Sequence, residues 1–251
     1  PRLPWVKGVD PDILTWSPDT DVWELYNLDE DFSQSKNVAD EYPEKLQMLK
    51  NLFLVESAKY KNMPIGGGLW TIIFHPELKV APEATSWELP GTITRIPEPC
   101  APRLGCLNNK VTIDMDIPAN ASGVLYKLGA NSGGLTLYMD EGILTYEYNL
   151  FIVERTKLRS DQPLPAGRHK LEVITEHTDD NPRGSLSIKV SLNGTQMIDG
   201  IVPRVAAVLF TANDCLDVGQ ALGSPVSLDY HERAPFKFNG TIHTMHVEYL
   251  E

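Results

Sequence analysis

After Pro99 the chain consists of short segments with the two-residue hydrophobic alternation of β-strands, separated by turn-forming residues. Residues 111–117 (V-T-I-D-M-D-I) alternate apolar and polar side chains, which is the pattern of a strand with one buried face. Asn193-Gly194 is a strong two-residue hairpin signal. The pattern predicts a mainly β fold, an antiparallel β-sandwich of the jelly-roll type, and argues against a parallel βαβ sheet. The other predicted strands are residues 123–128, 135–139, 144–149, 169–175, 185–192, 205–210 and 241–249.

The first hundred residues follow a different pattern. Residues 22–28 (V-W-E-L-Y-N-L) predict a strand, residues 29–36 a turn, and residues 69–74 a short apolar strand. Pro43 begins the clearest helix of the chain, which is expected to end near Asn62. One face of this helix carries Leu46, Leu49, Phe53 and Tyr60. We therefore expect a strand and helix within residues 1–65, a linker or irregular wrap over 66–98, and a sandwich over 99–251.

Charge and composition restrict the partners of the chain. Its net charge of −12 repels phosphate backbones, which argues against a nucleic-acid partner and against adhesion to anionic membranes. No apolar run reaches the roughly 18 residues of a membrane span. Three cysteines are too few for a disulfide framework. Cys100 and Cys106 are close enough to close a small loop, so a bridge and free thiols both remain open.

Residues 21–39 read D-V-W-E-L-Y-N-L-D-E-D-F-S-Q-S-K-N-V-A. This stretch resembles the closing segment of sulfatase catalytic regions, in which a W-x-L-Y-[ND]-L strand is followed by an acidic turn and N-[LV]-A. The resemblance implies that the catalytic part of such an enzyme lies before residue 1. Residues 1–65 would then be the last strand and helix of a sulfatase α/β region.

The second half of the chain carries further resembling segments in order. They are G-G-L-T-L-Y (133–138), L-T-Y-E-Y-N (144–149), S-D-Q-P-L-P-A-G (160–167), D-V-G (217–219), G-S-P-V (223–226) and P-F-K-F-N-G (235–240), with T-R-I-P-E (94–98) ahead of them. The series resembles the extra C-terminal domain of long bacterial arylsulfatases, a concanavalin-like or laminin-G-like jelly roll. The resemblance leaves the compartment open between bacterial periplasm and cytoplasm.

This resemblance implies that the chain is the non-catalytic C-terminal portion of an arylsulfatase-like sulfuric ester hydrolase. It would be a structural accessory to the catalytic domain, which would be its partner. The parent enzyme would use a formylglycine and a Ca²⁺ ion, and this chain would hold no cofactor of its own. Two alternatives remain, a carbohydrate-binding module for sulfated glycans and an oligomerisation module that uses an exposed strand at residues 22–28.

Candidate catalytic and metal residues do not form a convincing set. The sequence C-A-P-R (100–103) nearly matches the C-x-P-x-R sulfatase signature, but Arg103 comes one place too early, so we expect a loop there. His243 and His246 are three residues apart on a predicted strand, and strand alternation should point them to opposite faces. We therefore expect no catalytic residue and no metal site in this chain.

A sugar-binding face is the remaining candidate. Tyr146, Tyr148 and Asn149 belong to one predicted strand, and Arg155 follows it. Aromatic stacking and amide hydrogen bonds on such a strand would suit a glycan. Alternation places Leu144, Tyr146, Tyr148 and Leu150 on one face and Glu147 and Asn149 on the other. Tyrosines packed in an ordinary core explain the same pattern.

Overall fold

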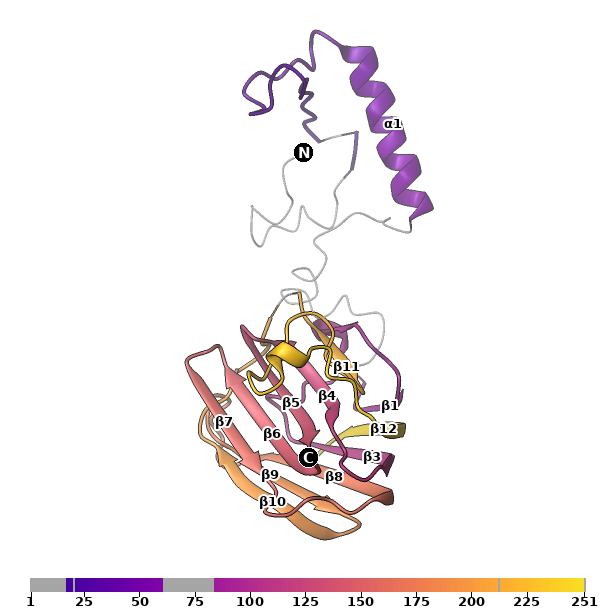
Figure 1. Cartoon of the computed structure of the whole chain (residues 1–251). Coiled ribbons are helices and arrows are strands. Elements are labelled where there is room, and N and C mark those ends of the chain that lie inside the picture. The colour runs from indigo at the N-terminus through magenta and orange to yellow at the C-terminus, as the bar shows by residue number, and fades with distance from the viewer. Residues whose placement is uncertain (1–16, 20, 61–83, 212, 251) are drawn as a thin grey trace. The chain divides into compact units, whose positions relative to one another are not determined.

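A computed structural model describes residues 17–19, 21–60, 84–211 and 213–250. The chain divides into two compact units, Pro1–Glu83 and Ala84–Glu251 (Figure 1). No helix among the described residues combines the length and the apolar character that crossing a membrane requires.

The described part of the first unit contains one helix, α1 (Pro43–Lys59), with its proline in the first turn and Glu44 at the positive end of the helix dipole. The strand predicted at residues 22–28 is wrong. This segment is irregular. Within the described part of the chain, the backbone carbonyl of Leu25 accepts the N–H of Val38 and its N–H donates to Oδ1 of Asn37, and neither partner belongs to a strand. A strand needs a neighbouring strand for its backbone groups, and none of the described residues provides one here.

The second unit is an antiparallel β-sandwich, which confirms the predicted fold class. Sheet A has the order β1 (Ser86–Pro90), β12 (Thr241–Tyr249), β3 (Asn109–Ile117), β8 (Gly167–His177), β9 (Leu186–Leu192) and β10 (Thr195–Val202). Sheet B has the order β2 (Ile96–Pro97), β11 (Cys215–Val218), β4 (Gly123–Ala130), β5 (Gly133–Asp140), β6 (Ile143–Leu150) and β7 (Glu154–Arg159). Two short 3₁₀ turns, Glu98–Cys100 and His231–Arg233, join the strands.

Several boundaries differ from the prediction. The sandwich begins before residue 99, because β1 pairs with β12 and β2 pairs with β11 inside the segment expected to be a linker. The strand predicted at residues 205–210 is wrong, since this stretch is a loop that pairs with no described strand. Strands β7, β10 and β11 were not predicted. The expected strand at residues 69–74 lies outside the described residues.

The core lies between the two sheets and is built from alternate residues of each strand. On β3 these residues are Val111, Ile113, Met115 and Ile117. Strands β4, β5 and β6 are buried on both faces, unlike β3. A segment that we call the strap, residues 219–238, covers the outer face of sheet B and crosses in front of β4 and β5 in Figure 1.

The strap is attached to sheet B by backbone hydrogen bonds and by a small second core. The N–H of Gly219 donates to Leu125, and the N–H of Val124 donates to Phe236. Tyr230 of the strap packs edge-on against Tyr138 of β5, with ring centroids 5.1 Å apart. Because the strap supplies both polar and apolar partners, an outer sheet face that is ordinarily hydrated is buried here.

Candidate functional site

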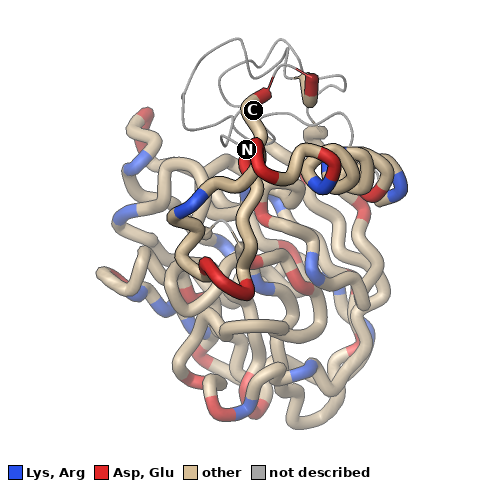
Figure 2. Tube along the Cα trace, turned by 90° about the horizontal axis from the view of Figure 1, so that it is seen from above, with Lys and Arg blue, Asp and Glu red and all other residues tan. Residues whose placement is uncertain are grey.

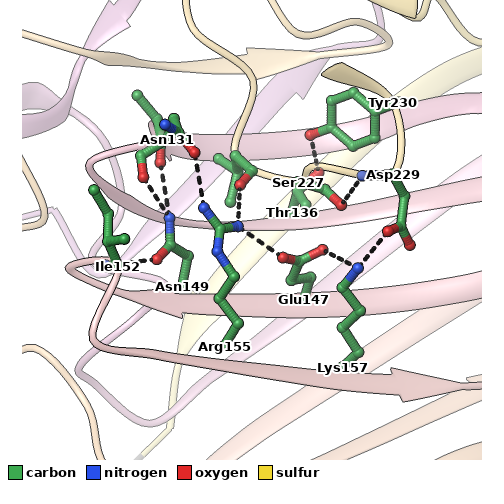
Figure 3. A network of polar contacts seen from close by, with 12 residues as sticks. Asn131, Thr136, Glu147, Asn149, Ile152, Arg155, Lys157, Ser227, Asp229 and Tyr230 are labelled. Carbon is green, nitrogen blue, oxygen red and sulfur yellow. Dashed lines mark hydrogen bonds and ion pairs between the residues drawn. The ribbon is translucent and has the colours of Figure 1, made fainter. Parts of the chain in front are cut away.

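The outer face of sheet B under and beside the strap holds a dense polar network (Figure 3). Strand alternation brings Glu147 and Asn149 of β6 to this face, together with Arg155 and Lys157 of β7. The strap contributes Asp229. This network includes Asn149 and Arg155, two of the four residues predicted from the sequence.

The centre of the network is the fully buried carboxylate of Glu147. Its Oε1 accepts a hydrogen bond from Nη1 of Arg155 at 2.9 Å, and its Oε2 lies 3.5 Å from the ammonium of Lys157. Arg155 also donates to the carbonyl of Val226 in the strap (2.7 Å) and to Oδ1 of Asn131 (2.7 Å). A buried charge of this kind is tolerated only when it is paired and hydrogen-bonded, and Glu147 is both.

Asp229 joins the strap to the edge strand β7. Its carboxylate accepts hydrogen bonds from Tyr138 (2.7 Å), Arg159 (2.7 Å) and Lys157. Partial burial disfavours the ionised form, but the hydrogen bonds from Lys157 and Tyr138 and the neighbouring positive charges outweigh it. The pKa of Asp229 is therefore lowered from its ordinary value. The carboxylate is held as an anion that anchors the strap.

A second ion pair lies under the start of the strap. Lys127 of β4 and Asp217 of β11 are almost completely buried and 3.1 Å apart. Asp217 also accepts the backbone N–H groups of Arg95 (2.7 Å) and Leu222 (3.0 Å). These contacts fasten two loops to the sheet, so the pair has a structural explanation.

The predicted residues Tyr146 and Tyr148 point away from this network and into the core. Both side chains are buried between the sheets. Tyr148 donates its hydroxyl proton to the carbonyl of Gly105 (2.9 Å) and accepts the N–H of Ala206 (2.9 Å). Burial raises the pKa of both phenols. Both tyrosines therefore fill the core, as the alternative interpretation of the sequence pattern predicted.

Asn149 and Arg155 lie on the outer face but are engaged in the fold. The amide of Asn149 donates to the carbonyls of Ala130 (3.4 Å) and Asn131 (2.8 Å) and accepts the N–H of Ile152 (2.9 Å). This amide joins the β4–β5 turn to the β6–β7 turn. Any role of these two residues in glycan binding stays a prediction.

Sequence reasoning missed Glu147, Lys157, Asp229 and Arg159. One signal was present, because E-R-T-K-L-R (154–159) places three cations at alternate positions, which a strand would display on one face. The strap partner of these cations could not be found in this way, since Asp229 is 72 residues from Lys157.

Charged residues and thiols also occur outside this network (Figure 2). Acidic and basic positions are interspersed along the trace in Figure 2. Among the described residues, no group of three or more His, Cys, Asp or Glu side chains could hold a metal ion. Cys100, Cys106 and Cys215 are free thiols in the structure. Burial raises the pKa of the Cys106 thiol to about 11.

No family model matches the chain, and no curated protein matches it. Among solved structures, LG domains 4–5 of the mouse laminin α1 chain are 15% identical with a TM-score of 0.44, over 68% of this chain and 43% of that one.

Two other solved structures are similar at the same level. The CBM40 of the Ruminococcus gnavus IT-sialidase, solved with α2,6-sialyllactose, is 16% identical with a TM-score of 0.41, over 67% of this chain and 93% of that one. Galectin LEC-6 of Caenorhabditis elegans is 12% identical with a TM-score of 0.39, over 67% and 99%. Such values are too low to support a functional argument. None of these three proteins is a sulfatase.

Proposed function

We propose that the chain is the non-catalytic C-terminal portion of an arylsulfatase-like sulfuric ester hydrolase and that its first unit packs against the catalytic domain. The formylglycine and the Ca²⁺ ion would belong to that domain. The observation that carries the proposal is the exposed apolar surface of helix α1. The sulfatase-like motif at residues 21–39 suggests the class of the enzyme.

Helix α1 exposes apolar side chains along most of its length. Leu52 and Val55 lie one turn apart and are 51% and 62% exposed, and Met48 continues the same row. Ser57 is its buried residue. A helix of this length is marginal in water without packing. Because these side chains are only about half exposed, covering them is worth about 1 kcal/mol each, and a protein surface over this row would stabilise the helix.

The acidic part of the motif has a structural role of its own. Asp31 accepts the backbone N–H of Lys36 (2.7 Å) and the hydroxyls of Ser33 (3.0 Å) and Ser35 (2.9 Å). The backbone hydrogen bonds are the main reason that the pKa of Asp31 is lowered to about 2. The D-F-S-Q-S-K sequence is therefore a self-contained turn. Its Phe32 is exposed, which adds to the apolar surface of this unit.

The first test is the coding sequence that precedes Pro1. The proposal requires an open reading frame with a C-x-P-x-R or S-x-P-x-R signature upstream. A reading frame that begins at Pro1 or encodes a domain of another class would overturn it.

The second test measures association. The preceding region and the chain of residues 1–251 are produced as two polypeptides and assayed for co-purification and for hydrolysis of nitrocatechol sulfate. Leu52→Glu with Val55→Glu should abolish co-purification, because two carboxylates would enter the apolar contact. Gln47→Glu with Asn51→Glu adds the same charge to polar positions of α1 and is the matched control. Equal association of both variants would contradict the proposal, as would sulfatase activity of the 1–251 chain alone.

One observation favours a sulfated-glycan module as the second candidate. The cations of β7 share the outer face of sheet B, and Lys157 and Arg159 are partly accessible beside the strap. Retention on dextran-sulfate resin that is lost in Lys157→Ala with Arg159→Ala, but kept in the sheet A control Lys189→Ala, would support it. The oligomerisation alternative loses its basis, because residues 22–28 form no exposed strand.

A further inference from the structure

The carboxylate of Asp229 lies among three hydrogen-bond donors that come from sheet B and not from the strap. Its Oδ2 accepts hydrogen bonds from the hydroxyl of Tyr138 (2.7 Å) and from Nη2 of Arg159 (2.7 Å). Its Oδ1 accepts a hydrogen bond from the ammonium of Lys157, a contact that Figure 3 shows. We call Tyr138, Lys157 and Arg159 the donor site. Because Asp229 is the one acceptor that all three share, it occupies this site as an anionic ligand would.

Backbone pairing in sheet B fixes the positions of these donors without the help of the strap. Tyr138 of β5 pairs with Thr145 of β6, and Thr145 pairs with Arg159 of β7, so the three residues form one row across the sheet. Lys157 lies two residues before Arg159 on β7 and therefore points to the same face. The donor site is preorganised, because its residues stay in place when the carboxylate of Asp229 moves.

The side chain of Asp229 can leave the donor site while the strap stays attached to the sheet. The next residue, Tyr230, is fully buried and donates its hydroxyl proton to Oγ1 of Thr136 (3.1 Å). The ring of Tyr230 also stacks on Phe236, with centroids 5.3 Å apart. The preceding residue, Leu228, is 58% exposed, and the side chain of Asp229 is itself 28% exposed. A rotation of this one side chain into solvent would therefore free the donors.

The charges around the donor site match a ligand with a single negative charge. Strand β7 contributes three cations, Arg155, Lys157 and Arg159. Two carboxylates, Glu147 and Asp229, face them, so the folded network keeps one net positive charge. When Asp229 turns away, a monoanion in its place would restore the same balance. A buried anion without such partners would be costly, and these donors supply them.

We propose that the donor site binds a sulfate monoester and that Asp229 is an internal competitor that occupies the site when this ligand is absent. The inference rests on the sulfated-glycan candidate of the proposed function, and it adds the residues that hold the sulfate group and the one that blocks them. A sulfate monoester has one negative charge and offers only acceptor oxygens. Lysine and arginine offer only donors, and the tyrosine hydroxyl already donates in this direction. A phosphate monoester carries about 1.5–2 negative charges near neutral pH, and its protonated form needs an acceptor that the emptied site lacks.

Isothermal titration calorimetry of the 1–251 chain with ethyl sulfate, at constant ionic strength, tests the site. Asp229→Ala should bind ethyl sulfate at least about tenfold more tightly than the unmodified chain, because the internal competitor is gone. Asp229→Asn removes only the charge and should show a smaller gain. Asp114→Ala is the matched control, since it removes the same charge from an exposed pair with Arg168 (2.8 Å) on sheet A and frees one arginine. Equal affinity of Asp229→Ala and the unmodified chain would overturn the proposal, as would an equal gain in the control.

The individual donors are tested in the Asp229→Ala background. Adding Arg159→Ala or Tyr138→Phe should reverse the gain in affinity, whereas adding Arg168→Ala on sheet A should leave it unchanged. A gain that survives the loss of Arg159 and of the Tyr138 hydroxyl would place the ligand elsewhere and overturn the donor site. Ethyl phosphate is titrated as the competing ligand, and tighter binding of ethyl phosphate than of ethyl sulfate would overturn the assignment to a sulfate monoester.

The unfolding midpoint gives a second readout, because Asp229→Ala also removes hydrogen bonds of the strap. Ethyl sulfate should raise the midpoint of Asp229→Ala, since a ligand stabilises the state that binds it, and should leave that of Asp229→Ala with Arg159→Ala unchanged. The absence of a rise in the first variant would overturn the proposal even if its strap is loosened. The sulfated-glycan candidate fails separately, if the unmodified chain is not retained on dextran-sulfate resin.

Discussion

Asn149 shows, at the scale of one residue, how a buried amide joins two turns of sheet B. Asn149→Ala removes its hydrogen bonds and leaves the carbonyl of Asn131 and the N–H of Ile152 without this partner. We expect the free energy of unfolding to fall by about 2–3 kcal/mol. Urea denaturation measures the change. The exposed residue Lys189, changed to Ala, should stay within about 0.5 kcal/mol of the unmodified chain. A similar loss in both variants would contradict this role of Asn149.

Glu98 should give the sandwich a pH-dependent stability. Its buried carboxylate accepts the N–H groups of Phe210 (2.6 Å) and Thr211 (2.8 Å). Desolvation outweighs these hydrogen bonds, so the pKa of Glu98 is raised above its ordinary value. The folded chain then binds this proton more tightly than the unfolded chain. The stabilisation is greatest below the unfolded pKa and decreases as the pH rises through the folded pKa.

Glu98→Gln provides the comparison, because glutamine does not titrate. We expect the free energy of unfolding of the unmodified chain, relative to that of this variant, to decrease as the pH rises above the range in which carboxyl groups ordinarily titrate. Urea denaturation at a series of pH values measures the difference, and the exposed residue Glu232 changed to Gln serves as the control. A difference that is constant, or that grows with pH, would show that Glu98 does not behave in this way.

At the same scale, the sequence predicted which face of a strand a side chain lies on better than it predicted whether that face is exposed to solvent. The two-residue period correctly separated Tyr146 and Tyr148 from Glu147 and Asn149. The period does not report which face will meet solvent. That depends on the strap, which returns to sheet B from distant positions such as Asp229. Partners so far apart leave no local signal in one sequence.

At the scale of elements, the β6–β7 turn carries a strain that one substitution should relieve. Ile152→Gly places at φ 68° the residue that tolerates this angle best. We expect the chain to gain about 1 kcal/mol, a rise of roughly 2–4 °C in the unfolding midpoint by calorimetry. Ile201→Gly, in the interior of β10, should lower the midpoint instead. A lower midpoint for the Ile152 variant would mean that its packing outweighs the strain.

Strand predictions succeeded where alternation was clear and failed where pairing decides the structure. Residues 111–117 form most of β3, as predicted. Residues 22–28 have the right composition but no partner strand among the described residues. Residues 205–210 are apolar because they cover the core, with Phe210 packed edge-on against Tyr148 at 5.2 Å. A run of apolar residues indicates that a segment is buried. Whether the segment is a strand or a loop over the core depends on whether a neighbouring strand pairs with its backbone.

Strand β12 shows how one irregularity changes a prediction about faces. Its pairing with β3 shifts register between Ile242 and Thr244. Within β12, the residues next to His243 and His246 that point inward are buried, so both histidines lie on the outer side of sheet A. The sequence predicted opposite faces for them, and the shift in register accounts for the difference. His243 lies 2.8 Å from Asp116, so the pairing partner of this histidine is a carboxylate.

At the scale of the whole molecule, the two units differ in how much of their apolar surface they bury within themselves. The sandwich pairs its strands within residues 84–251, and the strap closes the outer face of sheet B. Helix α1 instead exposes its apolar row, and its described aromatic contact is the edge-on pair of Phe53 with Trp23 at 5.6 Å. The jelly roll could be predicted from the sequence, but this imbalance could not, because it depends on which surfaces remain uncovered.

This difference predicts the outcome of limited proteolysis of the 1–251 chain. Opening α1 exposes little new apolar surface, so a dilute protease should cut within residues 21–60 well before it cuts within residues 86–249. The fragment that contains the sandwich should keep its unfolding midpoint within about 2 °C, since the free-energy change in its own core is near zero. Mass spectrometry identifies the cuts, and calorimetry measures the midpoint. Cutting at equal rates in both regions would contradict the prediction. Binding of the preceding region should slow cleavage in α1, because the apolar row would then be covered.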